Sequence, residues 1–263
     1  MPANAVPVEL GDVAAVAAAC DDDALLLWAA QGMGPRVRAW TLGEAVAVAC
    51  PDLNRRDRLA VRGPAAQAGA LVEYALQRLA PSYRVVGSRD LVEEVVAASP
   101  RLRVVGTFEW MDTDRLPPAP RHDRFVAGEG VGWLPATCEQ EVGALLAVAA
   151  PSSWAVPGLA GVRRWAGLRR PDATATAGAG LVAVAADAWS CPQMGFVAGV
   201  ATAAAWRGRG HGEAVCRFAL TELVAAHGRA ALMVDTDNHA AIALYERLGL
   251  RRRPLAAAAP AQD

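Results

Sequence analysis

Residues 196–212 place the strongest constraint on how this chain folds, because they read as a strand, a glycine-rich turn and the start of a helix. The first turn of a helix presents backbone N–H groups without intrahelical partners, and the helix dipole adds partial positive charge there. Glycines let the backbone approach a bound group closely, and arginines add charge-assisted hydrogen bonds. We therefore predict that a phosphate or pyrophosphate binds at the turn formed by Arg207, Gly208, Arg209, Gly210, His211 and Gly212.

Composition and spacing exclude two common phosphate-binding turns. A P-loop requires a lysine, and the chain has none, because all 26 of its basic residues are arginine. The lack of lysine also excludes Schiff-base chemistry. A dinucleotide-binding turn has the spacing Gly-x-Gly-x-x-Gly after the first strand of its unit. Here the spacing is Gly-x-Gly-x-Gly, and the turn lies late in the chain.

The size and charge of the chain bound the remaining classes. Its 263 residues suit one large or two ordinary domains. The net charge of −1 gives no electrostatic reason to expect nucleic acid or a membrane surface as partner. Five cysteines without CxxC spacing argue against a zinc ribbon and a disulfide framework. Without a signal peptide or an apolar span, the expectation is a cytoplasmic protein with reduced thiols and no metal.

The two halves of the chain repeat one order of elements: helix, strands, helix, strand, helix, strand. They share little sequence, so the repeat is one of topology. A proline-rich linker is predicted at 112–123. In the first half we predict helices at 8–19, 24–30, 65–79 and 91–98, and strands at 37–41, 45–50, 58–62, 83–86 and 102–110. In the second half we predict helices at 139–149, 212–227 and 240–248, and strands at 162–168, 181–185, 196–202, 230–234 and 250–255.

A second motif, NHAAIALYERLGL at residues 238–250, follows the strand predicted after the glycine-rich turn. Together the two motifs resemble the GNAT acetyltransferase superfamily. The pyrophosphate loop of that family, Gln/Arg-x-x-Gly-x-Gly/Ala, is matched by Arg207, Gly210 and Gly212. Its signature Asn-x-x-Ala-x-x-Leu-Tyr-x-x-Leu-Gly-Phe is matched by Asn238, Ala241, Leu244, Tyr245, Leu248 and Gly249, with Leu250 in place of Phe. The resemblance covers about residues 135–255.

The resemblance implies an α/β (α+β) fold with two GNAT-like domains, each a mixed central sheet flanked by helices. The domains would be residues 1–115, a degenerate domain without cofactor motifs, and 116–263, the catalytic domain. The implied reaction moves an acetyl (or other acyl) group from CoA to a primary amine by direct attack in a ternary complex. The strand ending at Val200, Ala201 and Thr202 would splay from its neighbour and bind the pantetheine arm, with a bulge at Gly199.

Tyr245 is the candidate general acid, because a phenol beside the sulfur can protonate the departing thiolate. Asn238 and Ala241 are expected at the cofactor arm, although Asn238 is equally suited to capping the helix that follows. Glu141 is the candidate general base, with Asp187 and Asp235 as alternatives, and the base remains unidentified. His211 is expected to be an exposed loop residue, and the thiol of Cys216 a buried structural one.

The first half has no counterpart of either motif. Residues 62–70, RGPAAQAGA, lack Gly-x-Gly, and Pro64 removes a backbone N–H where donors are needed. Three roles stay open for this half: part of the acceptor pocket, a homodimer surface, or a scaffold.

Two other functions of the protein also stay open. One is an acyl-CoA-binding sensor without turnover, and the other is a glycine N-acyltransferase-like enzyme with a longer acyl donor. The acceptor, a small-molecule or peptide amine, is not fixed by the sequence.

Overall fold

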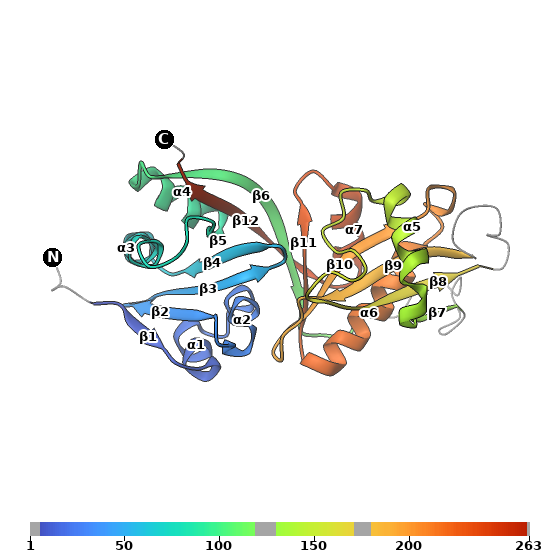
Figure 1. Ribbon diagram of the computed structural model, residues 1–263, viewed down its shortest axis with the longest axis horizontal. Coiled ribbons are helices and arrows are strands. Elements are labelled where there is room, and N and C mark those ends of the chain that lie inside the picture. Colours follow the sequence, from blue (N-terminus) through green and yellow to red (C-terminus); the bar gives the residue numbers. More distant parts are fainter. Residues whose placement is uncertain (1–5, 119–129, 171–179, 262–263) are drawn as a thin grey trace.

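The computed structural model describes residues 6–118, 130–170 and 180–261, in which twelve strands form one continuous mixed sheet (Figure 1). The strand order is β1-β2-β3-β4-β5-β12-β6-β11-β10-β9-β8-β7. The first half comprises β1 (Val8–Leu10), α1 (Val13–Cys20), α2 (Ala24–Ala30), η1 (Gln31–Met33), β2 (Arg38–Leu42), β3 (Ala45–Leu53), β4 (Arg56–Arg62), α3 (Ala65–Leu76), β5 (Arg84–Ser88), α4 (Arg89–Ala98) and β6 (Leu102–Thr113). The second half comprises β7 (Val131–Trp133), η2 (Ala136–Cys138), α5 (Glu139–Ala149), β8 (Val162–Arg169), β9 (Leu181–Ala188), β10 (Gly195–Thr202), η3 (Ala204–Trp206), α6 (His211–His227), β11 (Ala230–Asp235), α7 (His239–Arg247) and β12 (Arg251–Pro260).

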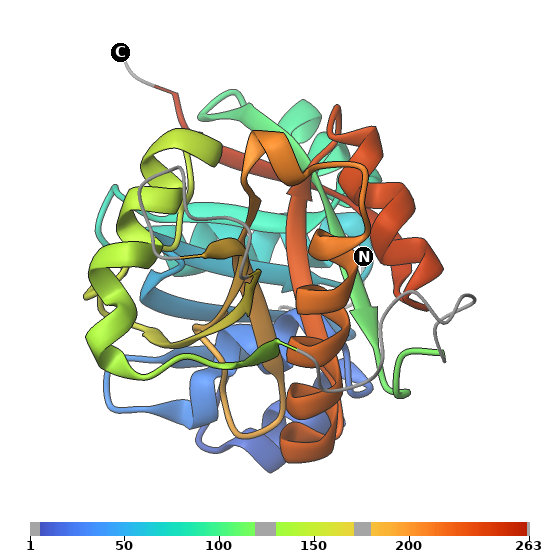
Figure 2. The same cartoon turned by 90° about the vertical axis from the view of Figure 1, so that its right-hand side faces the viewer.

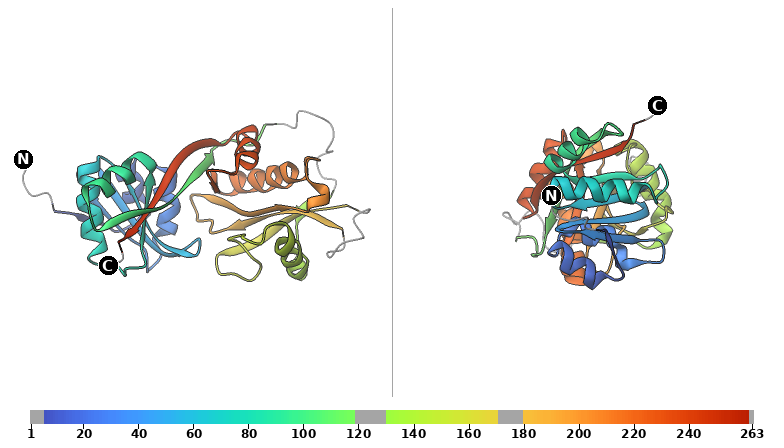
Figure 3. Two further views of the ribbon diagram at one scale, coloured as in Figure 1. Left: turned by 90° about the horizontal axis from the view of Figure 1, so that it is seen from above. Right: turned by 90° about the vertical axis from the view of Figure 1, so that its left-hand side faces the viewer.

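The strands of the sheet centre are apolar on both faces because helices cover both faces. In β9, Val184 and Ala186 face one core while Ala183 and Ala185 face another. In the first half, α3 and α4 pack on one face and α1 and α2 on the other; in the second half, α6 and α7 cover one face and α5 the other (Figures 2 and 3). The mixed α/β class and the repeated order of elements are therefore confirmed.

Several parts of the secondary structure differ from the predictions. Val8–Leu10 is a strand paired with β2, not the start of a helix, because Asp12 caps α1 by accepting a hydrogen bond from the Ala15 N–H. The strand β7 was not predicted; it is only three residues long. The last strand extends to Pro260, well beyond the predicted end at 255, because neighbours on both sides hold its alanines. Of the predicted linker 112–123, β6 includes residues up to Thr113, and 119–129 lie outside the described residues.

The sheet is continuous because β6 and β12 cross between the halves. β12, from the end of the chain, pairs antiparallel with β6 over most of its length and also with β5, through Leu255↔Ser88 to Ala258↔Val85. β6 in turn pairs with β11 of the second half. A division of the chain at 115/116 therefore does not divide the sheet, since the strand beside β5 comes from the second segment. Those domain bounds stay a prediction.

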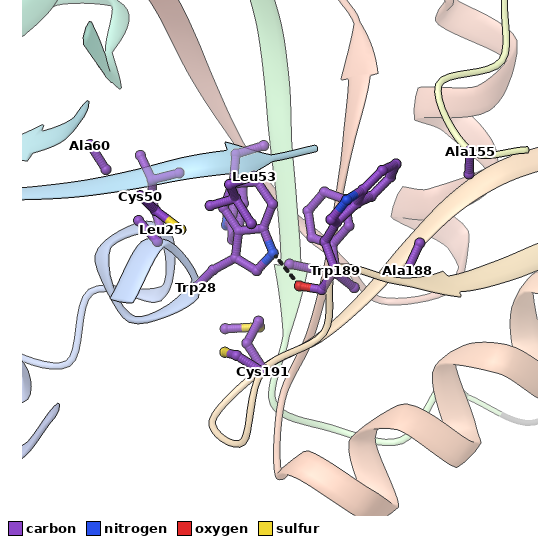
Figure 4. Close-up of a cluster of buried hydrophobic side chains, with 14 of the residues drawn as sticks. Leu25, Trp28, Cys50, Leu53, Ala60, Ala155, Ala188, Trp189 and Cys191 are labelled. Carbon is purple, nitrogen blue, oxygen red and sulfur yellow. Dashed lines mark hydrogen bonds between the residues drawn. The ribbon is translucent and has the colours of Figure 1, made fainter. Parts of the chain in front are cut away.

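One hydrophobic core extends across both halves on the face of α2 and α5. At its centre the fully buried Trp28 ring stacks on Phe196 at 4.6 Å between centroids and lies 5.6 Å from the ring of Trp110. Its indole Nε1–H donates to the Trp189 carbonyl at 3.0 Å (Figure 4). This contact joins α2 to the loop after β9, so the halves share apolar burial as well as strand pairing.

We expect Trp28→Ala to lower the free energy of unfolding by about 3–5 kcal/mol, because it leaves a cavity where the two halves meet. Trp28→Phe keeps the stacked ring and loses the indole N–H, so its cost should be smaller. Denaturant unfolding measures both, with Val148→Ala at a side chain 80% exposed as the control. A Trp28→Ala cost no larger than that of the control would contradict the role assigned to this core.

A second prediction concerns pH and the buried carboxylate of Glu109, which is 0% exposed on β6. Arg252 of β12 donates to it at 3.0 Å, and Arg89 of α4 lies 3.6 Å away. The hydrogen bond from Arg252 holds the pKa of Glu109 below its ordinary value. Ionised Glu109 therefore stabilises the fold above the unfolded-state pKa of about 4.3, and this contribution is lost as pH falls through the lower folded-state pKa.

Glu109→Gln should accordingly destabilise the protein at neutral pH, by on the order of 1–3 kcal/mol, and the difference from the unsubstituted protein should shrink in acid. Unfolding measured at a series of pH values between 3 and 8 tests this. The control is Glu73→Gln, whose carboxylate faces Arg101 in an exposed pair. A destabilisation by Glu109→Gln that is the same at every pH would refute the linkage.

Candidate functional site

Strands β10 and β11 separate after three residue pairs. Their parallel register covers only Gly195↔Ala230, Phe196↔Ala231 and Val197↔Leu232. On its other side β10 bulges against β9 between Ala198 and Ala201, which confirms the bulge predicted at Gly199. Gly199 has φ +60°, and a Cβ there would lie 2.7 Å from the Trp165 ring. Only glycine fits this position, and the bulge directs β10 away from β11.

A cavity of about 490 Å³ lies at this separation, between the two halves of the chain. The second half contributes walls from β10, β11, the loop after α5, and the start and body of α7. The first half contributes the β3–β4 turn, whose tip points toward the second half in Figure 1, and residues of β4, β5 and β6. Of the predicted pantetheine-binding residues, Val200 lines the cavity, while Ala201 and Thr202 continue β10 beyond its walls and pair with β9.

The glycine-rich turn connects β10 to α6. Gly208 and Gly210 have φ values of +72° and +83°, which L side chains rarely adopt, and both are exposed. The first intrahelical bond runs from the Ala214 N–H to the Gly210 carbonyl, so the amides of Gly212 and Glu213 precede it. A Cβ on Gly212 would lie 3.1 Å from Thr202 Oγ1, which sets the turn against the end of β10. The arrangement offers an exposed helix N-terminus to an anion.

The side chains of the turn differ in their contacts and in their exposure to solvent. Arg207 is committed to the protein, since its Nε donates to the Thr202 carbonyl at 3.2 Å and its Nη2 to the Ala149 carbonyl at 3.0 Å. Arg209 is exposed and stacks over Trp206 at 4.9 Å. The expectation that His211 is exposed was wrong: it begins α6, is 5% exposed and packs 5.4 Å from Trp206. The first turn of α6 therefore directs this ring inward.

Tyr245 on α7 lines the cavity and is 6% exposed. Burial raises the pKa of its phenol well above 10, and the nearby Cys216 thiol adds to the shift. The hydroxyl thus stays protonated at neutral pH and can donate a proton or hydrogen bond. Cys216 is buried in α6, as predicted for a structural thiol, and burial raises its pKa to about 12, which makes it a poor nucleophile.

Asn238 both caps α7 and lines the cavity. Its Oδ1 accepts a hydrogen bond from the Ala241 N–H at 3.2 Å, so it caps α7, and the residue also lines the cavity. The capping role left open by the sequence is therefore real. Ala241 is half-buried against the core beneath α7 and is not part of the cavity wall. The cap fixes the start of α7 and with it the direction of Tyr245, two turns later.

The three candidate bases lie in different places. Glu141 on α5 pairs with Arg169 at 2.7 Å and does not line the cavity, so the structure does not bring it together with Tyr245. Asp187 is 2% exposed and accepts from Ser190 Oγ at 2.6 Å and from Arg164 Nε at 3.1 Å. Its role is structural. Asp235, exposed at the end of β11, does line the cavity.

Sequence reasoning missed the residues that the first half contributes. Asn54, Arg56, Arg58 and Arg84 line the cavity, and none belongs to a recognisable motif. The available signal was the charged turn NRRDR at 54–58 between two apolar strands. Nothing in its local pattern indicates that the turn reaches the second half.

Neither a metal site nor a membrane-spanning helix is found in the described ranges. No group of three His, Cys, Asp or Glu side chains there is placed to hold an ion, and all five cysteines are unpaired. No helix within the same ranges is long and apolar enough to cross a membrane.

Comparisons with known proteins agree with this geometry. Residues 165–250 match the model of the acetyltransferase (GNAT) family. Among solved structures, the chain is similar to a GCN5-related N-acetyltransferase from Kribbella flavida (16% identity, 83% of this chain and 87% of that one, TM-score 0.56). It is also similar to a GCN5-related N-acetyltransferase from Sphaerobacter thermophilus (18% identity, 98% and 97%, TM-score 0.53) and a GCN5-related N-acetyltransferase-like protein from Streptococcus suis 89/1591 (10%, 95% and 98%, TM-score 0.52).

At these identities the solved structures establish a shared fold only. No curated protein matches the sequence. The matched residues 165–250 contain the separation of β10 and β11, the glycine-rich turn and Tyr245. Over this part of its second half, the chain is similar to the acetyltransferase (GNAT) family.

Proposed function

We propose that the protein is an N-acyltransferase that moves an acetyl group, or another acyl group, from CoA to a primary amine in a ternary complex. The observation that carries the proposal is the opening between β10 and β11, which leads into a cavity lined by Tyr245. The strand that forms one side of this opening continues directly into the exposed glycine-rich turn. The strand β10 thus runs from the cavity that Tyr245 lines to the turn that would bind the pyrophosphate.

The donor would bind along β10. Beyond Val197 the edge of β10 that faces β11 pairs with no strand of the described residues, so its main-chain groups could hydrogen-bond the amides of the pantetheine arm as an added strand would. The pyrophosphate would sit at the turn from Arg207 to Gly212, on the amides of the first turn of α6. Arg209, which stacks over Trp206, would add positive charge near this point, whereas the hydrogen bonds of Arg207 hold the turn in shape.

In the reaction, the neutral amine attacks the thioester carbonyl, the C–N bond forms and the C–S bond breaks. Tyr245 donates its proton to the departing sulfur, so that CoA leaves as the thiol. The amine loses one proton, which Asp235 takes up, directly or through water. Proton return to the phenolate restores Tyr245. We favour Asp235 over Glu141 for this role, because Asp235 lines the cavity and Glu141 is paired elsewhere.

Tyr245→Phe should lower kcat by about 10²-fold, the lower range for loss of a general acid. The KM for acetyl-CoA should change little, because the ring remains. The measurement is CoA thiol release across amino acids, polyamines, aminoglycosides and peptide N-termini. The control is Tyr74→Phe on α3, which lies outside the cavity. Tight acetyl-CoA binding without thiol release from any amine would instead favour the sensor function.

The glycine-rich turn has its own test. Gly208→Ala should weaken binding of CoA by roughly 10-fold, since alanine resists the φ of +72° and displaces the amides that would hold the pyrophosphate. Titration calorimetry with CoA measures this. The matched control is Gly158→Ala, at a φ of +76° with equally open surroundings. Equal CoA affinity in both variants would rule out the turn as the phosphate site.

A further inference from the structure

The first half of the chain places three guanidinium groups on one wall of the cavity. Arg56 and Arg58 stand two residues apart on β4, so they share a face of the strand. Arg84 on β5 is the direct parallel partner of Arg58 in the sheet. All three line the same cavity as Tyr245. Three positive side chains therefore converge on the cavity in which the acyl transfer is proposed.

These arginines have no carboxylate partner among the described residues. Arg58 is 6% exposed, and its Nε donates to the Leu53 carbonyl at 2.9 Å. Arg56 stacks on Trp154 of the second half at 5.4 Å. Asp57, between them in sequence, is engaged with Ser82 Oγ at 2.5 Å and the Asp52 N–H at 3.0 Å.

In the part of the chain that the structure describes, no ion pair therefore compensates the positive charge of this wall. Burial, with the charge of Arg56 as a smaller cause, lowers the pKa of Arg58 to about 10. A buried guanidinium without an anion is costly, and a bound carboxylate offsets that cost. Among the described residues that line the cavity, Asp235 is the only acidic one, and it comes from the second half, at the end of β11.

A second observation on the same wall also points to a ligand. Asn54, in the turn between β3 and β4, is 7% exposed, and its Oδ1 has no hydrogen-bond partner in the described structure. An unpaired buried amide oxygen is costly, and a ligand N–H would satisfy it. The wall thus combines cationic donors with one neutral acceptor, which suits a molecule that carries both a carboxylate and an N–H group.

We propose that the acceptor is an amine that also carries a carboxylate, of the amino-acid class, and that Arg56, Arg58 and Arg84 bind this carboxylate while the amine faces the opening between β10 and β11. This inference rests on the proposed acyl transfer. Arginine forks match carboxylate geometry, so they would fix the orientation of the acceptor as well as attract it. The same wall would repel polyamines. The first half of the chain would then determine which acceptor the second half acylates.

The test compares matched acceptors with the full-length protein. Thiol release from acetyl-CoA is measured with a panel of amino acids, with the carboxamides of the same amino acids and with polyamines. The amino acids should exceed their carboxamides in kcat/KM by at least about 10-fold, the effect of one charge-assisted hydrogen bond. Carboxamides or polyamines that react as well as the acids would overturn the proposal.

Substitutions of the arginines then test whether they cause the preference for amino acids over carboxamides. Arg84→Gln, at a half-buried site, should raise the KM for the preferred amino acid about 10-fold and leave the KM for acetyl-CoA unchanged. Arg56→Gln, at an exposed site, is the second variant, in case the first is poorly folded. Arg78→Gln on the outer surface is the control. A rise in the KM for acetyl-CoA alone would mean that the arginines bind phosphates of the donor, and would reject the proposal.

Direct binding separates this inference from the proposed function. Calorimetric titration of the amino-acid panel into the CoA-loaded protein requires no turnover. Binding that is weakened by Arg84→Gln, without any thiol release, would reject catalysis and leave the carboxylate site standing. Thiol release with no preference for acids and no effect of Arg84→Gln would support the acyl transfer and reject the carboxylate site.

Discussion

The antiparallel pairing of β6 with β12 is the interaction on which the rest of the structure depends. These two strands run between the halves and carry the hydrogen-bond ladder from β5 to β11 without a break. Because the ladder is continuous, the β3–β4 turn of the first half is held at a fixed place beside the opening of β10. The shared cavity is thus a consequence of strand pairing, and no separate domain interface is needed to form it.

Two side-chain arrangements reinforce the crossing. On the α2 and α5 face of the sheet, Trp28 stacks on Phe196. Phe196 directly precedes Val197, the last residue of β10 that pairs with β11. Glu109 holds β6, α4 and β12 together from within the sheet, through Arg89 and Arg252. The first is apolar and independent of pH, whereas the second depends on an ionised carboxylate. Proline at 254 is compatible with the crossing, because pairing of β12 with β5 begins only at Leu255.

The sequence predicted the local features of the site because those features are set by neighbours in the chain. The helix Glu139–Ala149 begins and ends where its periodicity indicated, and the bulge at Gly199 and the turn before α6 follow from glycines in a strand and at a helix start. The inward direction of His211 was not predictable, since it depends on Trp206 packing from the preceding turn.

Long-range pairing accounts for the other differences. The alanine run of β12 has weak strand propensity and is a strand because β5 and β6 lie on both sides of it. The arginines at 56, 58 and 84 lie more than a hundred residues from Tyr245, and only the fold brings them to one cavity. Their sequence pattern is that of ordinary charged residues near strand ends, so it carries no sign of a binding wall.

The position of β12 also dictates the order in which the protein can assemble during synthesis. Leu255 pairs with Ser88, so the first half emerges from the ribosome long before the strand that closes its sheet. Until then β5 has an open edge, which is a site for mispairing with other chains. Contacts between residues so distant in sequence also slow folding. The first half is therefore the part that most needs protection until β12 has been synthesised.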